Sequence, residues 1–334
     1  MDSTMKMAEG QHIHVIYNSF TRFWKDMVMQ HYDLPEYDNT LIFSFPLPSA
    51  TPELDDMKMG VVGMEIKPNQ RLQHLADAGT ILIIDLDEYR GQYSKIIWYD
   101  LERPFPVPYP YHQAPYIFER VDEVWIPWIE SLAQYPREYR DKYVFKPMRY
   151  LEGMFDMTPN DNPKWDMGFI GAPAPWGCDY RVRVMQALFD SVKHWYYEDK
   201  LISEEKYRYW HAGGVDVEDM KDMIKNTKFM IDLPSDDFKF YSQNVLRLNE
   251  LVSAGVPCVS CSGQFNYFPG VVDFGESSNP MEVINRKVFE EVRRDVKNKW
   301  KRMTDKDEDY SSYINHLLKN YEETNGDIWI TTVV

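Results

Sequence analysis

The sequence predicts an α/β protein with two Rossmann-like, doubly wound domains that face a cleft, followed by C-terminal helices. Its 334 residues are enough for two cores of roughly 150 residues each. Short strand-like apolar runs alternate with segments of helical periodicity, as in parallel sheets covered by helices. The alternation stops once, in a stretch rich in Pro, Asn and Asp between residues 150 and 164, and then begins again. Each series predicts one domain.

The first predicted domain covers residues 1–150. A helix is expected over 19–31, and another over 69–78, which Pro68 precedes and Gly79 ends. The predicted strands are HIHVIY (12–17), LIFSFPL (41–47), TILIIDL (80–86), KIIWYD (95–100), DEVWIP (122–127) and YVFKPM (143–148), with one more expected within 60–66.

The second predicted domain covers residues 165–279, and residues 280–334 are expected to form helices that pack across the domains. Two such helices, 280–303 and 307–322, are predicted, the first from apolar residues at four-residue spacing up to Trp300. The domain itself is predicted to contain strands at 165–172, 207–213, 228–233 and 256–261 and helices at 179–197, 216–226 and 243–254.

Composition and charge exclude several classes of protein. The chain has 37 basic and 53 acidic residues, and a net charge of −16 repels polyanions over most of the surface, which argues against a dedicated nucleic-acid binder. Its three cysteines are too few for a disulfide framework, so we expect buried thiols. No apolar run is long enough for a membrane span, and the N-terminus has no signal-peptide pattern. We therefore expect a cytoplasmic protein without a membrane partner.

The segment YSQNVLRLNELVSAGVPCVSC, residues 241–261, carries the strongest chemical signal. Ser242 is a candidate N-cap of the predicted helix, and Gly255 its terminator. The free amides of a helix N-terminus suit a diphosphate, and Arg247 adds a guanidinium. Glu250, three positions later, lies on the same face and can accept two hydroxyl hydrogen bonds. The alternative is an Arg–Glu ion pair on a solvated helix.

The run RLNELVSAGVPCVS within this segment resembles the C-terminal donor motif of GT-B glycosyltransferases. The resemblance implies that Arg247 contacts the diphosphate of a nucleotide sugar and that Glu250 binds donor hydroxyls. Uridine diphosphate is the commonest carrier in that family. It also implies that the two Rossmann-like domains have the GT-B arrangement, with the donor bound mainly by the C-terminal half.

Two further segments resemble donor-site segments of the same family. In DMGFIGAPAPWGCDYR, residues 166–181, Gly171 would let the backbone approach the donor and Arg181 would contact phosphate. In WHAGGVDVEDM, residues 210–220, His211 would touch the base or a phosphate. Surface charge for Arg181 and a structural role for His211 are the alternatives.

Sugar transfer requires a base for the acceptor hydroxyl and stabilisation of the departing diphosphate. Asp87 and Asp100, at predicted strand ends of the first domain, are the preferred catalytic pair, although each could instead be a cap or loop residue. Helix amides and Arg247 can stabilise the leaving group, so no cofactor or metal is expected to be required. Asp85 and Asp87 form a D-x-D pair that could hold a divalent metal, but we favour the acceptor or catalytic role.

The acceptor is less well specified. The proline- and aromatic-rich loop 100–112 could stack a sugar or a nucleobase, or simply pack rigidly. Residues 286–302 carry eight basic against three acidic groups, which could attract a polyanion or be a solvated helix face. A hydroxymethylated base in viral DNA, modified in the host cytoplasm, is one acceptor hypothesis. A glycan, a lipid-linked or a small-molecule acceptor, or a non-catalytic two-lobed binding protein, are the alternatives.

Overall fold

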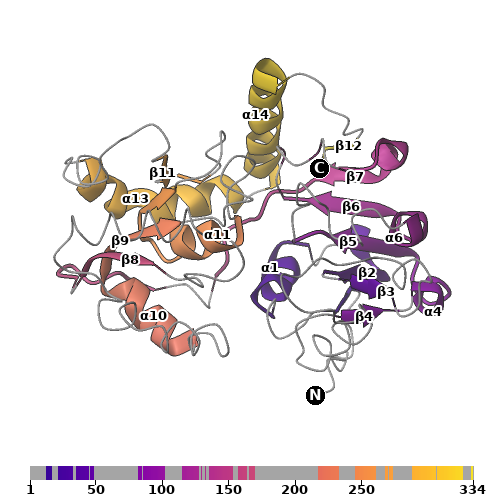
Figure 1. Cartoon of the computed structure of the whole chain (residues 1–334), viewed down its shortest axis with the longest axis horizontal. Coiled ribbons are helices and arrows are strands. Elements are labelled where there is room, and N and C mark those ends of the chain that lie inside the picture. The colour runs from indigo at the N-terminus through magenta and orange to yellow at the C-terminus, as the bar shows by residue number, and fades with distance from the viewer. Residues whose placement is uncertain are drawn as a thin grey trace, which may run out of the picture. The chain divides into compact units, whose positions relative to one another are not determined.

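The computed structural model divides the chain into two units, which are residues 1–147 with 314–334, and residues 148–313 (Figure 1). The described residues are 13–16, 22–32, 35–44, 46–48, 82–84, 86–101, 115–127, 129, 132, 135–152, 157–163, 165–169, 217–232, 245–260, 268–269, 271–273, 288–305, 307–325 and 332–333.

A six-stranded parallel sheet forms the centre of the first unit, with strand order β1-β2-β5-β6-β7-β12. A separate pair of parallel strands joins β3 to β4. The apolar runs form strands because both faces of a parallel sheet are buried, and β2 is buried at all of its positions. The strands are β1 (Ile13–Ile16), β2 (Thr40–Phe43), β3 (Pro46–Pro48), β4 (Leu82–Ile84), β5 (Lys95–Tyr99), β6 (Glu123–Ile126), β7 (Tyr143–Phe145) and β12 (Thr332–Val333).

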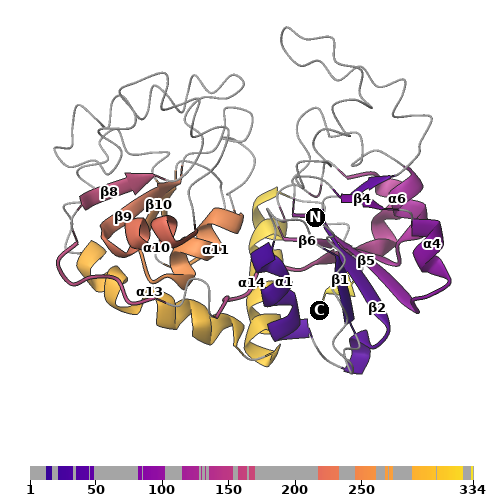
Figure 2. The ribbon, with the colours of Figure 1, turned by 90° about the horizontal axis from the view of Figure 1, so that it is seen from below.

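Helices lie on both faces of this sheet (Figures 1 and 2). Tyr32, at the end of α1 (Arg22–Tyr32), packs against Trp125 on one face, with ring centroids 5.0 Å apart. On the other face Phe118 packs against Trp98, at 5.5 Å. Phe118 belongs to α6 (Pro115–Arg120), which lies beside α4 (Leu86–Arg90). This unit also contains two 3-10 helices, η1 (Pro35–Tyr37) and η3 (Arg137–Lys142).

The second unit contains a four-stranded parallel sheet of order β11-β10-β9-β8. Its strands are β8 (Trp165–Phe169), β9 (Thr227–Asp232), β10 (Cys258–Ser260) and β11 (Val271–Asp273). Figure 2 shows α13 running below α11, and these two helices contact each other. The helices are α10 (Val217–Lys225), α11 (Val245–Ser253), α13 (Val288–Thr304) and the first residues of α14 (Asp307–Asn325), which enters the first unit at Ile314.

The predicted α/β class with parallel sheets and helices is confirmed for the described part of the chain. Strands β11 and β12 and helices α4 and α6 were not predicted. Residues 280–334, expected to form helices that pack across the domains, are divided between the two units at residues 313 and 314. In each of the two larger sheets, the described strands lie side by side in their order along the chain. The described strands therefore show no point at which the order reverses, which is where ligands of doubly wound sheets usually bind. The predicted elements at 60–66, 69–78, 179–197 and 207–213 lie outside the described residues.

Gly255 terminates helix α11, as the sequence predicts. Gly255 has a φ of 79°, in the left-handed region, its amide donates to the carbonyl of Val252 at 3.0 Å, and the amide of Val256 donates to the carbonyl of Leu251 at 3.0 Å. This is the Schellman arrangement, in which a residue without a Cβ stops the helix. The chain then turns into β10, so the glycine fixes where helix and strand meet.

Replacing Gly255 by alanine is expected to destabilise the protein by about 1–2 kcal/mol, because an L-residue is strained in the left-handed region. An added Cβ would have ordinary room, 3.4 Å from Cβ of Lys297, so the backbone conformation alone carries the effect. Urea unfolding measures the change. Gly91→Ala, where nothing lies within 4 Å, is the control, and equal stability of both variants would contradict the explanation.

Candidate functional site

Parallel topology places the chemistry of the second unit at the edge where its strands end, here named its carboxyl edge. Helix α11 connects the parallel strands β9 and β10, so it runs back across the sheet and begins at that edge. Ser260 is the last residue of β10, and Asp232 and Asp273 are the last residues of the two neighbouring strands, β9 and β11. Ser260 pairs with both of them in the strand register. The Ser260 hydroxyl donates to Oδ2 of Asp232 at 3.2 Å, and both residues are buried.

Arg247 and Glu250, the central pair of the sequence prediction, lie in the first two turns of α11 and contact each other. Nη1 of Arg247 donates to Oε2 of Glu250, and it also lies 3.4 Å from the sulfur of Met220 on α10. Glu250 is only 7% exposed. The ion pair that was the alternative to a ligand-binding role is therefore present, but not on a solvated helix face.

Burial makes Glu250 an unusual carboxyl group. Loss of solvent raises its pKa above the ordinary value, and the positive charge of Arg247 acts in the opposite direction without cancelling that effect. A carboxyl group held in such a site favours partners that supply hydrogen bonds, whether a guanidinium or the hydroxyls of a ligand. Raised carboxyl pKa values of this kind are frequent at functional sites.

The first turn of α11 has the charge that a bound anion prefers. It holds Arg247 and no acidic residue. A cation near a helix N-terminus opposes the helix dipole, and acidic residues normally occupy this position. The first turn of α14, with Asp307, Glu308 and Asp309, shows the usual pattern in the same chain. The start of α11 therefore combines the amides of a helix N-terminus, a guanidinium and, one turn later, a buried carboxyl group at one edge of a parallel sheet.

The predicted catalytic pair is placed in two different surroundings. Asp87 lies in the first turn of α4, not at a strand end, because β4 stops at Ile84 and a short helix follows. Its carboxylate is 64% exposed and accepts from Nε of Arg120 at 2.8 Å. Asp100 directly follows β5, is 1% exposed and accepts a hydrogen bond from the hydroxyl of Tyr135. A catalytic role for either residue stays a prediction.

The other predicted donor residues, Gly171, Arg181 and His211, lie outside the described residues. So do Asp85, Ser242 and residues 102–112 of the aromatic loop.

Sequence reasoning missed Lys146, which lies directly after β7 at the carboxyl edge of the first sheet. It is 1% exposed, and its Nζ donates to the hydroxyl of Tyr37 at 3.0 Å. The ammonium also lies 4.5 Å from the ring centroids of both Tyr32 and Trp125, so aromatic faces replace its hydration. The signal in the sequence was a lysine inside the apolar run YVFKPM.

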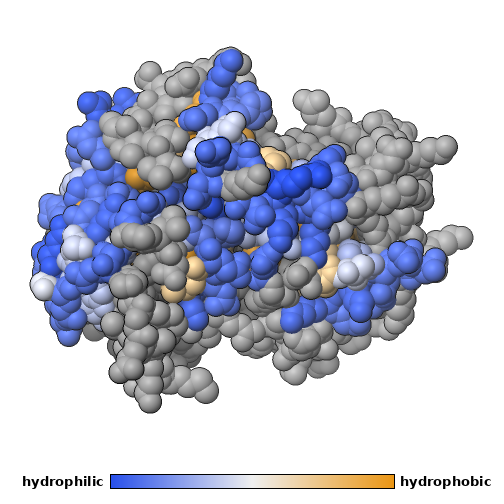
Figure 3. Space-filling view, turned by 180° about the vertical axis from the view of Figure 1, so that it is seen from behind, coloured by the Kyte–Doolittle hydropathy of each residue, from blue (hydrophilic) through white to orange (hydrophobic). Residues whose placement is uncertain are grey.

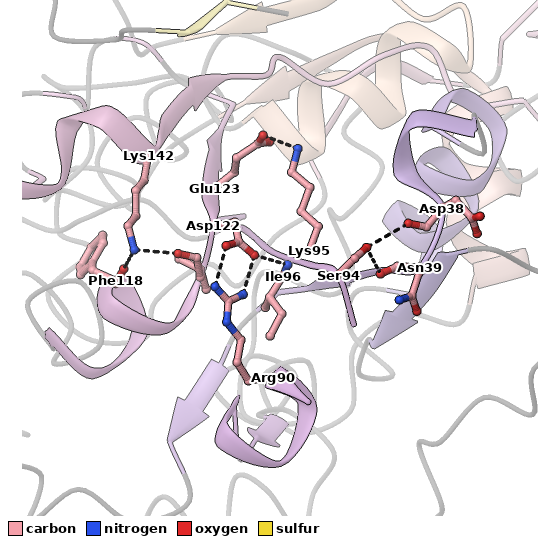
Figure 4. A network of polar contacts seen from close by, with 11 residues as sticks. Asp38, Asn39, Arg90, Ser94, Lys95, Ile96, Phe118, Asp122, Glu123 and Lys142 are labelled. Atoms are coloured by element: carbon pink, nitrogen blue, oxygen red, sulfur yellow. Dashed lines mark hydrogen bonds and ion pairs between the residues drawn. The ribbon is translucent and has the colours of Figure 1, made fainter. Parts of the chain in front are cut away.

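Figure 4 shows a polar network at the opposite, amino edge of the first sheet. Asp122 accepts two hydrogen bonds from Arg90, at 2.6 and 2.7 Å, and one from the amide of Ile96, at 2.7 Å. Burial raises the pKa of Asp122, but these bonds and the charges of Arg90 and Lys142 outweigh it and leave the pKa below its ordinary value.

Lys142 extends the same network to helix α6. Its Nζ donates to the carbonyls of Phe118 and Val121 at 2.6 and 2.8 Å, which satisfies the end of α6 (Figure 4). All these groups precede strands rather than follow them. We therefore interpret the network as a structural clamp and not as a ligand site.

The described surface offers no rival site of comparable definition. On the face in Figure 3 its side chains are mostly hydrophilic, with only small separate apolar spots. In the predicted basic strip, Lys297 donates to the carbonyl of Met157 at 3.3 Å, and Lys301 and Arg302 pair with Glu152 and Asp295. No cluster of three or more His, Cys, Asp or Glu residues suited to a metal occurs in the described ranges. None of the helices described there has the length and apolarity that crossing a membrane requires.

Comparison with known proteins adds little to this geometry. No protein-family model matches the sequence, and no curated protein matches it. Among the matching solved structures is the crystal structure of the GtfA/B complex, at 11% sequence identity and a TM-score of 0.38. The match covers 85% of this chain and 57% of that chain. A likeness this distant carries no argument about function.

Asp122→Asn is expected to lower the free energy of unfolding by about 1–2 kcal/mol at pH 7, because the amide loses the charged bonds to Arg90. A carboxyl group with a lowered pKa stabilises the fold above its ordinary pKa of 3.8, and this contribution disappears as the pH falls below that value. The difference in the free energy of unfolding between the variant and the wild type should therefore become smaller at acidic pH. Chemical unfolding between pH 2.5 and 7 measures it.

Asp141→Asn is the matched control, because the Asp141 side chain is 81% exposed and lies 3.7 Å from Arg140. It should change stability by less than about 0.5 kcal/mol. A difference for Asp122→Asn that stays constant down to pH 2.5 would contradict the role of its charge.

Arg247→Met is expected to cost about 2–3 kcal/mol at pH 7, because it leaves the Glu250 carboxylate buried without its cation. Because the pKa of Glu250 is raised in the folded state, ionising this group lowers the free energy of unfolding once the pH rises above its ordinary pKa of 4.5. The cost should therefore be small at pH 4 and large at pH 7. Adding Glu250→Gln to Arg247→Met should remove the pH dependence, and a cost equal at both pH values would refute this account.

Proposed function

We propose that this chain is a glycosyltransferase of the GT-B type, which transfers a sugar from a nucleotide diphosphate to a hydroxyl acceptor. One observation carries the proposal. Arg247 and the buried Glu250 form a pair at the start of α11, at the carboxyl edge of a parallel sheet, within the run RLNELVSAGVPCVS that resembles the donor motif of this class.

In the proposed complex the ion pair is exchanged for contacts to the donor. The Arg247 guanidinium turns from Glu250 to the diphosphate, next to the amides at the start of α11. The Glu250 carboxylate then accepts hydrogen bonds from two hydroxyls of the donor. Both charges keep partners throughout, so the exchange avoids leaving a buried charge alone.

During transfer, Arg247 and the amides at the start of α11 stabilise the negative charge that develops on the leaving diphosphate. Gly171, Arg181 and His211 are proposed to complete the donor site. Asp100 or Asp87 is proposed as the base that accepts the proton of the attacking hydroxyl. The donor is proposed to be a uridine diphosphate sugar, and no metal is required in this scheme. The acceptor is proposed to be a hydroxymethylated base in viral DNA, with a glycan or a small molecule as the alternative.

The competing function is a non-catalytic protein that binds a ligand between two α/β lobes. Such a protein binds its ligand but has no leaving group to stabilise. The two functions differ in one simple assay. A glycosyltransferase slowly releases free nucleotide diphosphate from its donor by hydrolysis, and a binding protein releases none.

The test is a thermal-shift panel of nucleotide diphosphates and their sugars against wild type, Glu250→Gln and Glu308→Gln. A ligand at a hundred times its Kd should raise the Tm of the wild type by about 5–10 °C. Glu250→Gln should weaken binding about tenfold and so reduce that shift to about half. Glu308, exposed on α14, is the control and should behave as the wild type. No shift with any nucleotide would overturn the proposal.

A further inference from the structure

A buried hydrogen bond fastens the helix that carries Arg247 and Glu250. Oδ1 of Asn249 accepts from Nε1 of Trp300, on α13, at 2.8 Å. Asn249 is 1% exposed and Trp300 is completely buried. The indole itself is held by Phe268 and Tyr313, whose ring centroids lie 4.7 and 6.2 Å from it. The donor of this bond therefore has a fixed position.

The bond controls rotation of α11 about its own axis. Successive residues of an α-helix are turned by about 100°, so Asn249 points away from the side that carries Arg247, two positions earlier. Apolar packing between helices is not directional and tolerates small rotations. A hydrogen bond is directional, and breaking it inside the protein leaves the buried indole N–H of Trp300 without its acceptor.

A second set of bonds ties the same two helices to the chain at residues 150 and 151. Oδ1 of Asn249 also accepts from Ser253, at 3.2 Å, and the Ser253 hydroxyl accepts from the amide of Leu151 at 3.5 Å. On α13, the hydroxyl of Thr304 accepts from the amide of Tyr150 at 2.8 Å and donates to the carbonyl of Trp300 at 3.1 Å. Both helices are thus hydrogen-bonded to the same short stretch of backbone, residues 150 and 151.

We propose that Asn249 and Trp300 are positioning residues for donor binding, because their hydrogen bond orients the Arg247–Glu250 pair toward the nucleotide sugar. The inference rests on the proposed function. It adds that donor affinity depends on a residue of α13 that is completely buried and is not proposed to touch the donor.

Trp300→Phe tests the proposal, because it removes the indole N–H and keeps an aromatic ring in the core. The probe is the nucleotide diphosphate sugar that gives the largest shift in the thermal panel. Calorimetric titration, at a temperature where every variant is fully folded, should give a Kd about fivefold weaker than that of the wild type. Val296→Ala, one turn earlier on α13 and also buried, is the matched control for lost core packing and should keep the wild-type Kd.

A double-mutant cycle separates positioning from general weakening. If the bond aims Glu250 at the donor, Glu250→Gln should weaken binding less in the Trp300→Phe background than in the wild type. Additive effects, or an unchanged Kd for Trp300→Phe, would overturn the proposal. A smaller loss of affinity from Glu250→Gln in the Trp300→Phe background, together with a wild-type Kd for Val296→Ala, would support the proposal.

If the wild type binds no nucleotide, the proposed function is wrong, but the role of the hydrogen bond can still be tested. Hydrogen exchange tests it without a ligand. Amides of residues 245–253 should exchange faster in Trp300→Phe than in Val296→Ala if the bond holds α11 in place. Equal exchange in the two variants would show that the bond does not orient the helix.

Discussion

Parallel pairing of strands is the constraint on which the rest of the structure depends, because all nine described strand pairs are parallel. Parallel neighbours cannot be joined by tight turns, so each connection must cross back over the sheet. All strands of one sheet therefore end at the same edge, and a helix that leads to the next strand begins there. The arrangement collects strand-end side chains and helix N-termini in one place, whatever their purpose.

The two edges of a parallel sheet are used differently in this chain. At the amino edge of the first unit, Asp122 and Lys142 satisfy backbone groups and join α4, α6 and the strands. At the carboxyl edges charged groups are buried beside a few side-chain partners, as with Lys146 beside Tyr37 and aromatic rings and Glu250 beside Arg247. The first pattern strengthens a fold. The second holds charge in a medium where it interacts strongly with whatever replaces its partner.

Local patterns in the sequence predicted the features that depend on residues close together in the chain, such as strands and helix ends. The apolar run KIIWY became β5, and Gly255 marked the end of α11. The spacing of Arg247 and Glu250 predicted a shared helix face, but not the burial of Glu250, which depends on tertiary packing. The surroundings of Lys146 also come from residues distant in sequence, Tyr32, Tyr37 and Trp125. Strand β12 was missed because two residues carry no periodic signal, and it exists only through its pairing with β7.

That pairing has a consequence for how the protein is made. The sheet of the first unit is completed by Thr332 and Val333, which follow their partners Val144 and Phe145 far later in the chain. At ordinary rates of translation the interval between the synthesis of β7 and that of β12 is on the order of 10–40 s. Throughout it, the edge of β7 that β12 will cover carries unpaired amides and carbonyls, the kind of edge that recruits strands from other chains. Correct assembly of the first unit is thus a matter of timing during synthesis as well as of final stability.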